Sequence, residues 1–216
     1  MTAGTFGERA ASGSVFVTGT DTDVGKTVVS AALTLGLGAA YWKPIQAGTA
    51  PSTDTGDVKA WTGLPDSRFL PETYVLEAPM SPHAAAALEG IEIDPERILA
   101  TVPPADRPVV VEGAGGLMVP VGPATLVIDL IAGLGLPVVL VARTGLGTLN
   151  HTLLSVAELR RRAIPLLGVV LNGAPHESNH RAIETYGDVP VLGRVPPLSA
   201  LDAASLSAAF AALELS

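Results

Sequence analysis

Near its start the chain reads Ser14-Val15-Phe16-Val17-Thr18-Gly19-Thr20-Asp21-Thr22-Asp23-Val24-Gly25-Lys26-Thr27. Its apolar residues 15–17 predict a buried parallel strand, and the Ala- and Leu-rich residues 28–37 predict a helix. A phosphate-binding loop makes physical sense between such elements, because backbone N–H groups and the helix dipole there attract an anion. Lys26 would place a positive charge on the outer phosphates, and the Thr27 hydroxyl would bind magnesium.

The spacing of the two glycines departs from the common phosphate-loop pattern. That pattern has about four residues between its glycines, whereas five separate Gly19 from Gly25, and Thr20 takes the usual first position. The alternative is an ordinary turn with an exposed Lys26. That alternative leaves the glycines and the polar residues of the turn unexplained, so we expect a variant nucleotide-binding loop.

Composition indicates one globular domain. The chain has 216 residues, is 48% hydrophobic, carries a net charge of −8 and contains no Cys. These values suit a single α/β domain over residues 14–216. The acidic balance argues against nucleic acid as a partner, and the lack of Cys excludes disulfides and thiolate chemistry. No apolar run approaches the roughly 18 residues of a membrane span.

Residues 1–13 are expected to form a mobile leader. They contain Glu8 and Arg9 and lack an apolar segment, so they do not form a secretory signal. A cytoplasmic location is the expectation that fits both this segment and the absence of Cys.

The remaining pattern alternates strands and helices. Together it predicts six or seven parallel strands with helices on both faces, a P-loop NTPase-like α/β fold. Strands are expected at 15–17, 39–42, 108–111, 137–142, 165–171 and 189–192, and helices at 28–37, 57–62, 84–88, 95–101, 126–132, 148–162, 176–186 and 200–213. Residues 64–82 are rich in Pro and are expected to be an irregular surface excursion.

Two further residues are expected at the carboxyl ends of strands. Lys43 follows the strand at 39–42, and Glu112 ends the apolar run at 109–111 before a Gly-rich continuation. Ligands of open parallel sheets bind at this edge. A carboxylate there can reach magnesium, and the glycines let a ligand approach the backbone closely. The alternative for Glu112 is a solvated strand end.

A zinc-peptidase pattern also occurs, in His176-Glu177-Ser178-Asn179-His180. Such a motif needs the middle of a helix, so that both imidazoles share one face, and a third ligand. Here Pro175 stands immediately before it. We therefore interpret these residues as a solvated helix start.

Taken together, the motifs resemble the dethiobiotin synthetase family, ATP-dependent enzymes that close the ureido ring in biotin synthesis. The resemblance runs from about residue 15 to 198, and the family shares the five-residue spacing of the loop. The segments that carry it are Val17 to Thr27, Lys43-Pro44-Ile45-Gln46-Ala47-Gly48, Ser81-Pro82-His83, Val111-Glu112-Gly113-Ala114-Gly115-Gly116 and Leu146-Gly147-Thr148-Leu149-Asn150-His151.

The resemblance implies ATP and Mg²⁺ as cofactors and assigns residues to each ligand. For the nucleotide they are Asp23, Val24, Gly25, Lys26, Thr27, Val28, Gly113, Ala114 and Gly115, with Asn172, Pro196, Pro197 and Leu198 beside the adenine. For magnesium they are Thr27, Asp57 and Glu112, with Asp57 preferred to Asp54 because it is expected to open a helix. For the diamine they are Thr22, Lys43, Ala47, Gly116 and Asn150, and the catalytic residues are Lys43, Lys26 and Thr22.

The family's reaction and partners follow from the same resemblance. In the family, 7,8-diaminononanoate takes up CO₂ as a carbamate, forms a mixed anhydride with the γ-phosphate and closes the ring. A homodimer is implied, with Asn150 reaching the partner's substrate site, and neither nucleic acid nor membrane is expected as a partner. Some relatives have Ser or Thr at the position of Ala47, and their hydroxyl could hydrogen-bond the substrate. Ala47 lacks that hydrogen bond.

Three rival functions are open at this point. A MinD- or partition-type regulatory ATPase shares the fold, but carries an extra lysine where this chain has Asp21 and lacks Lys43-Pro44. A cobyric-acid-type synthetase has a glutaminase domain with a Cys, whereas this chain contains no Cys. A binding module without catalysis would leave the lysines and magnesium acids idle.

Overall fold

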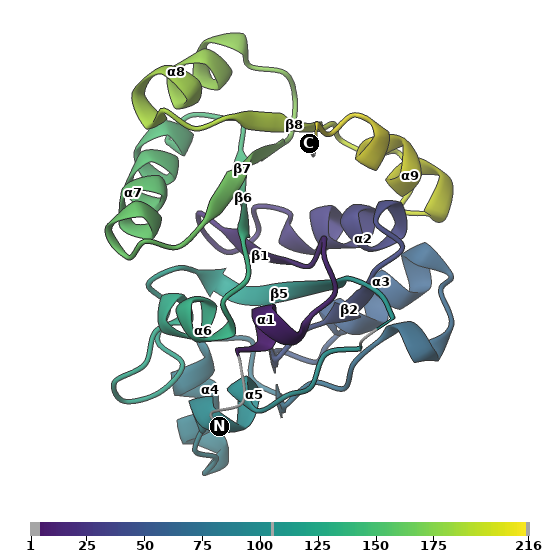
Figure 1. Ribbon diagram of the computed structural model, residues 1–216, viewed down its shortest axis with the longest axis vertical. Helices are drawn as coiled ribbons and strands as arrows, with labels where there is room; N and C mark the ends of the chain where they lie inside the picture. The colour runs from purple at the N-terminus through teal and green to yellow at the C-terminus, as the bar shows by residue number, and fades with distance from the viewer. Residues whose placement is uncertain (1–4, 105, 215–216) are drawn as a thin grey trace.

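The computed structural model describes residues 5–104 and 106–214 and is built on a parallel sheet (Figure 1). Its six strands lie in the order β2-β5-β1-β6-β7-β8. They are β1 Val15–Gly19, β2 Ala40–Trp42, β5 Val109–Gly116, β6 Val138–Arg143, β7 Leu166–Asn172 and β8 Val191–Val195. The predicted P-loop-like α/β class with a parallel sheet is confirmed.

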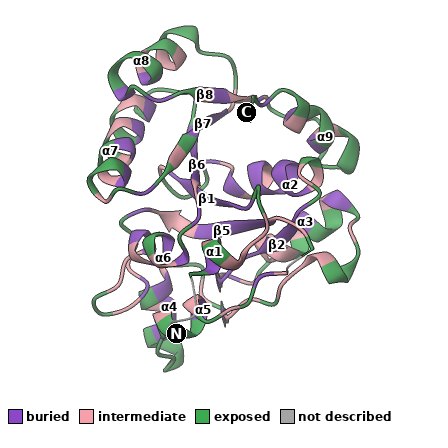
Figure 2. Ribbon diagram, in the orientation of Figure 1, coloured by how far each residue is buried: buried purple, intermediate pink, exposed green. Residues whose placement is uncertain are grey.

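Helices cover both faces of this sheet (Figures 1 and 2). They are α1 Phe6–Arg9, α2 Lys26–Gly36, α3 Asp54–Thr62, α4 Pro82–Glu89, α5 Pro95–Leu99, α6 Val127–Leu134, α7 Thr148–Arg161, α8 Glu177–Gly187 and α9 Ala203–Ala211. Alternate residues of the central strands divide between the faces. Val15 and Val17 join the core under α2 and α9, whereas Phe16 joins the core under α6. Strands buried on both faces read as continuous apolar runs, which is why the sequence revealed them.

The predicted excursion over residues 64–82 contains regular structure. It holds the 3-10 helix η1 Asp66–Arg68 and the strand β4 Tyr74–Leu76, which pairs in parallel with β3 Ile45–Ala47 in a second, two-stranded sheet. Tyr74 and Leu76 are buried while Val75 between them is exposed. Strands of three residues are too short to display a period, so the prediction of an irregular segment was wrong here.

Among the element boundaries that differ from the prediction, two lie beside the expected site. Helix α3 begins at Asp54, three residues before the expected start, because the Thr53 hydroxyl accepts the Gly56 N–H at 3.0 Å and caps it. Strand β5 continues past Glu112 to Gly116, whose partner in β1 is Gly19 after an irregularity in the register. Glu112 therefore lies inside a strand rather than at its tip.

The described part of the expected leader packs against the domain. Phe6 is buried and stacks on Trp42 with ring centroids 5.2 Å apart. Gly7 lies so close to the neighbouring turn that a Cβ would be 2.2 Å from the Gly135 oxygen. For residues 5–13 a mobile leader is thus corrected to a short helix seated on the core, while residues 1–4 lie outside the described residues.

In the described ranges, none of the helices has the length and apolar character that a membrane span requires.

Candidate active site

The loop between β1 and α2 has the backbone of a phosphate-binding loop. Gly25 precedes α2 with φ +94°, a conformation that favours glycine. A Cβ at Gly25 would lie 2.0 Å from Nδ2 of Asn172, so space as well as conformation requires glycine there. The predicted strand, turn and helix around Gly25-Lys26-Thr27 are confirmed.

Three side chains hold the carbonyl groups of this loop. Lys26 Nζ donates to the Asp21 oxygen at 2.9 Å, Arg143 to the Thr22 oxygen at 2.9 Å, and Asn172 Nδ2 to the Val24 oxygen at 3.0 Å. Arg143 and Asn172 are register partners at the carboxyl ends of β6 and β7. A trans peptide points its N–H opposite to its carbonyl, so the bonds from Arg143 and Asn172 turn the N–H groups of Asp23 and Gly25 away from the ends of β6 and β7.

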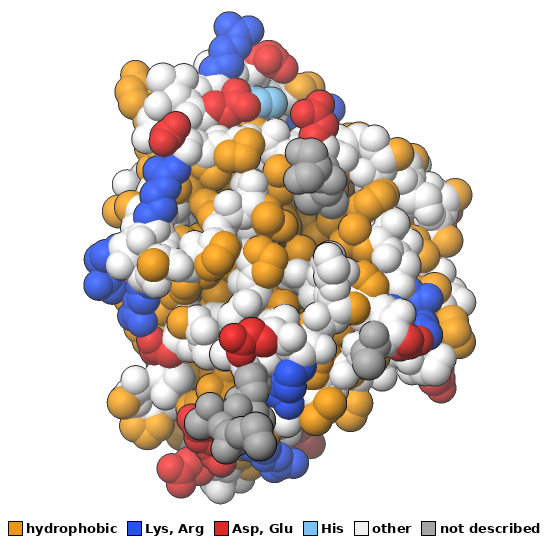
Figure 3. Space-filling view, viewed as in Figure 1, with side chains coloured by type: hydrophobic (Ala, Val, Ile, Leu, Met, Phe, Trp, Pro, Cys, Tyr) orange, Lys and Arg blue, Asp and Glu red, His pale blue; other side chains and the backbone are white. Residues whose placement is uncertain are grey.

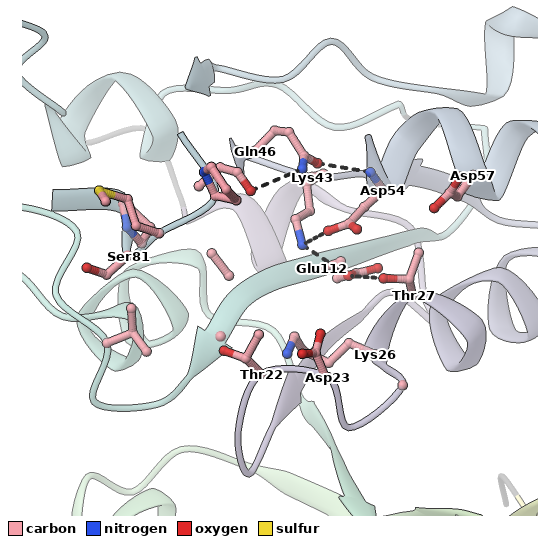
Figure 4. Close-up of a pocket in the computed structure, with 18 of the residues that line it drawn as sticks. Thr22, Asp23, Lys26, Thr27, Lys43, Gln46, Asp54, Asp57, Ser81 and Glu112 are labelled. Atoms are coloured by element: carbon pink, nitrogen blue, oxygen red, sulfur yellow. Dashed lines mark hydrogen bonds and ion pairs between the residues drawn. The ribbon is translucent and has the colours of Figure 1, made fainter. Parts of the chain in front are cut away.

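A buried ionic network lies beside the loop (Figure 4). The fully buried Glu112 accepts hydrogen bonds on Oε1 from Thr27 Oγ1 and from Lys43 Nζ, each at 3.0 Å. Its other oxygen, Oε2, accepts from the Tyr41 hydroxyl at 2.9 Å. Lys43 Nζ also contacts the Asp54 carboxylate and donates to the Gly113 oxygen at 3.2 Å. The predicted residues Thr27, Lys43 and Glu112, from a helix, a loop and a strand, therefore meet at one point.

The charges in this network change the acidity of its members. Burial alone would lower the pKa of Lys43, but the carboxylates of Glu112 and Asp54 outweigh it and raise that pKa. The pKa of Lys26 is lowered by burial and by the like charge of Lys43. Burial and the Glu112 charge raise the pKa of the Tyr41 hydroxyl. Lys43 is thus held as an ammonium, and Tyr41 as a neutral hydrogen-bond donor.

The reason for preferring Asp57 to Asp54 does not hold, because α3 opens at Asp54. Asp54 is the carboxylate that contacts Lys43, while Asp57, one turn further along, accepts the Ser52 hydroxyl at 2.7 Å. Both line the same cavity (Figure 4). A magnesium role for Asp57 stays a prediction, with Asp54 as the alternative.

Gln46 joins the end of β3 to the start of α3. Its Oε1 accepts the Asp54 N–H at 3.1 Å and its Nε2 donates to the Gly48 oxygen at 2.7 Å. The buried amide thereby holds Asp54, the first residue of α3, in place. The sequence contained Gln46 within the Lys43-Pro44 segment, but no role was predicted for it.

The network borders a cavity of about 740 Å³. The predicted site residues in its wall are Thr22, Asp23, Gly25, Lys26, Thr27, Val28, Lys43, Ala47, Asp57, Glu112, Ala114 and Gly115. The wall is completed by Asp54, the alternative to Asp57, and by residues that were not predicted, namely Gln46, Trp61, Pro79, Met80, Ser81, Pro82 and Val119. The Ser81-Pro82 segment was part of the family resemblance but had no assigned role. The structure places it in the wall of this cavity.

Other predicted site residues lie outside that wall. They are Val24, Gly113, Gly116, Asn150, Asn172, Pro196, Pro197 and Leu198. The Gly113 carbonyl accepts from Lys43 in the wall, whereas the Val24 carbonyl accepts from Asn172, which braces the loop. Gly116 borders a second cavity of about 350 Å³ together with His151 and Leu154. Asn150 lies exposed in the first turn of α7, beside that second cavity's wall.

The zinc-peptidase pattern starts outside a helix, as interpreted from the sequence. His176 is the N-cap of α8, and its Nδ1 accepts the Asn179 N–H at 3.4 Å. His180 pairs with Glu184 at 3.5 Å instead of facing His176.

Comparison with known proteins gives close relatives over most of the chain. A protein-family profile described as an AAA domain matches residues 13–205. An ATP-dependent dethiobiotin synthetase from Rhizorhabdus wittichii is 53% identical over 198 residues, which cover 92% of this chain and 94% of that protein. Another protein of that description, from Afipia carboxidovorans, is 54% identical over 195 residues, 90% of this chain and 92% of its own length.

Solved structures show similarity of fold. A ParA family ATPase from Chlorobium tepidum has a TM-score of 0.55 at 13% identity, covering 94% of this chain and 90% of its own. The cell division ATPase MinD from Pyrococcus furiosus has a TM-score of 0.54 at 16% identity, covering 92% and 97%. At these identities the likeness concerns the fold alone and does not support the rival regulatory function.

Proposed function

This chain belongs to the ATP-dependent dethiobiotin synthetase family, and from that premise we propose that it is an ATP-dependent carbon–nitrogen ligase. It converts 7,8-diaminononanoate and CO₂ into dethiobiotin, with ADP and phosphate as the other products. The observation that carries the proposal is the convergence of Lys43 and Glu112 on the loop that holds Lys26, at one wall of a large cavity.

The proposed reaction has three balanced steps. One substrate amine attacks CO₂ and loses a proton, which gives a carbamate. A carbamate oxygen attacks the γ-phosphorus of ATP, so that ADP leaves and a carbamic–phosphoric anhydride forms. The second amine then attacks the carbonyl carbon and loses a proton as phosphate leaves, and the ureido ring closes.

The lysines suit this chemistry because several negative charges must be brought together. Lys26 is the first residue of α2, beside the phosphate loop. Lys43 is held as an ammonium by its hydrogen bond to Glu112. Fixed charges of this kind stabilise the transition state without reorganising during the reaction. We assign Lys26 to the outer phosphates and Lys43 to the carbamate and γ-phosphate, and Thr22 to the substrate amine.

The wall of the cavity fits a magnesium ion. Thr27 Oγ1 and Glu112 Oε1 lie 3.0 Å apart, and the carboxylates of α3 stand in the same wall. Hard oxygen donors of these types are the ligands that Mg²⁺ takes in phosphate sites. When bound, the ion neutralises charge on the nucleotide phosphates. We propose Thr27, Glu112 and Asp57, with Asp54 as the alternative, as its ligands.

The diamine is proposed to occupy the part of the cavity bordered by Ala47, Gly115 and residues 79–82. A homodimer is part of the proposal, because Asn150 is exposed on α7 and does not reach the cavity of its own chain. The cytoplasmic location expected from the sequence stays a prediction.

The test is incubation of the protein with diaminononanoate, bicarbonate, Mg²⁺ and ATP, with dethiobiotin measured by mass and ADP measured in parallel. Equal amounts of dethiobiotin and ADP are expected. Lys43→Ala should keep ATP binding but lose turnover by roughly 10²- to 10³-fold, the cost of removing one transition-state donor. The control is Lys59→Ala, which removes an exposed lysine paired with Asp66. Wild-type turnover by Lys43→Ala would remove Lys43 from the mechanism, and ADP release without dethiobiotin would refute the proposed activity.

A further inference from the structure

Tyr41 is a buried polar side chain that the proposed reaction does not use. It lies on β2, its side chain is fully buried, and its hydroxyl donates to Glu112 Oε2 at 2.9 Å. The ring packs edge-on against Phe69 at 6.2 Å. Its hydroxyl is thus directed by packing at the one Glu112 oxygen that neither Thr27 nor Lys43 contacts.

The register of the sheet brings these groups to one face. Tyr41 pairs with Val110, and side chains alternate along each strand, so Tyr41, Lys43 and Glu112 all point toward the face that α2 covers. Thr27 lies in the first turn of α2. Glu112 therefore accepts hydrogen bonds on both oxygens, at Oε2 from Tyr41 and at Oε1 from Thr27 and Lys43 of the cavity wall.

We propose that Tyr41 is a positioning residue that fixes the rotation of the Glu112 carboxylate, so that Oε1 faces the cavity as a metal ligand. This inference rests on the proposed magnesium site. Partners that hydrogen-bond a ligating carboxylate orient it, and removing one typically costs 10- to 100-fold in metal affinity or activity. Without the Tyr41 hydroxyl, Oε2 has no donor among the residues that the structure describes, and the carboxylate is free to turn both oxygens toward Lys43.

The experiment compares two tyrosine variants by a readout other than activity. Mn²⁺ is titrated into the protein saturated with ADP and followed by electron paramagnetic resonance. Tyr41→Phe keeps the ring and removes the hydroxyl, and we expect Mn²⁺ to bind roughly 10- to 100-fold more weakly. The control is Tyr74→Phe, which loses a different hydrogen bond, from the Asp94 N–H at 2.9 Å, and should bind Mn²⁺ as the wild type does.

Turnover gives a second measure of the same effect. The Mg²⁺ concentration for half-maximal turnover should rise by a similar factor in Tyr41→Phe, while the KM for diaminononanoate stays unchanged.

Sucrose, which is excluded from protein surfaces and favours the folded state, is added equally to every titration so that a less stable variant stays folded. Melting temperatures confirm that each variant is folded.

A double variant separates positioning from general damage to the fold. In a Glu112→Gln background, Tyr41→Phe should have no further effect on Mn²⁺ affinity, because its target carboxylate is gone. An equal loss in both backgrounds would overturn the positioning role. Unchanged Mn²⁺ binding in Tyr41→Phe alone, with loss in Glu112→Gln, would also overturn it. Unchanged binding in Glu112→Gln would instead show that the proposed metal site is wrong.

Discussion

Arg143 shows how a single residue outside the motif shapes the phosphate loop. It stands at the carboxyl end of β6 and is 55% exposed, yet its guanidinium donates to the Thr22 oxygen and lies 3.6 Å from the Asp21 carboxylate. The bond fixes the peptide whose N–H belongs to Asp23. Exposure limits the strength of the ion pair, so the hydrogen bond to the loop is the larger part of its contribution.

We predict that Arg143→Ala weakens ADP binding about fivefold, the equivalent of about 1 kcal/mol for one hydrogen bond. Isothermal titration calorimetry measures the change, and added guanidinium should restore part of the affinity. Arg181→Ala is the control, since Arg181 is an exposed arginine on α8 that pairs only with Glu177. Equal ADP affinity in Arg143→Ala and wild type would show that the loop holds its conformation without this bond.

At the scale of an element, α7 is tied to α6 by a surface network that responds to acid. Glu158 accepts from Arg161 and Arg162, and Arg162 also contacts Asp129 of α6. Basic side chains follow α7 on the face seen in Figure 3, and its last turn carries Arg160 and Arg161. Hydrogen bonds from the two arginines lower the pKa of Glu158 from 4.5 to about 2.

This shift predicts how acid affects stability. The folded state keeps Glu158 ionised where the unfolded state protonates it, so the stabilisation is complete above pH 4.5 and is lost as the pH falls toward about 2. Melting temperature measured across this range should fall less steeply in Glu158→Gln than in wild type. Because the group lies at the surface, the difference is small. The control is Glu177→Gln, which removes an exposed ion pair with Arg181 at 3.9 Å and should leave the dependence of melting temperature on pH unchanged. The same dependence in Glu158→Gln as in wild type would exclude the α6–α7 network as the source of the acid sensitivity.

For the whole molecule, exposed apolar side chains surround the second cavity. Met118 and Leu154 line it and are exposed, and Leu146 at the start of α7 is fully exposed. Rimmed apolar patches of this kind mark contact surfaces. Together with the exposed Asn150 they support the homodimer proposed above.

We predict that Leu154→Glu converts a dimer into monomers, as measured by light scattering during size-exclusion chromatography. Its KM for diaminononanoate should rise, while ADP still binds, because Leu154 lines the second cavity and not the larger one that Lys26 and Thr27 border. The matched control is Leu88→Glu, a 71% exposed leucine on α4. A monomeric wild-type protein would contradict the predicted assembly.

The sequence predicted what depends on local pattern. The central strands are continuous apolar runs, and Lys26, Thr27, Lys43 and Glu112 follow or end such runs, so their meeting at one sheet edge was predictable. The short elements β3, β4 and α1 were missed, whereas the equally short β2 was predicted from its apolar residues. Tyr41, Gln46 and Arg143 were also missed, and Asp54 was placed second to Asp57, because their roles depend on contacts between segments distant in sequence.

The wall that residues 79–82 give to the large cavity has a consequence for enzyme engineering. The opposite walls are built from the phosphate loop and the buried ion network, where Thr27 and Lys43 both bond to Glu112. Met80, by contrast, is exposed, and the Ser81 side chain makes no capping hydrogen bond to α4. A combinatorial library limited to these two positions would change the shape of the pocket for the aliphatic chain and leave the triphosphate-binding residues intact. Such a library could be selected for activity on diamines of other lengths.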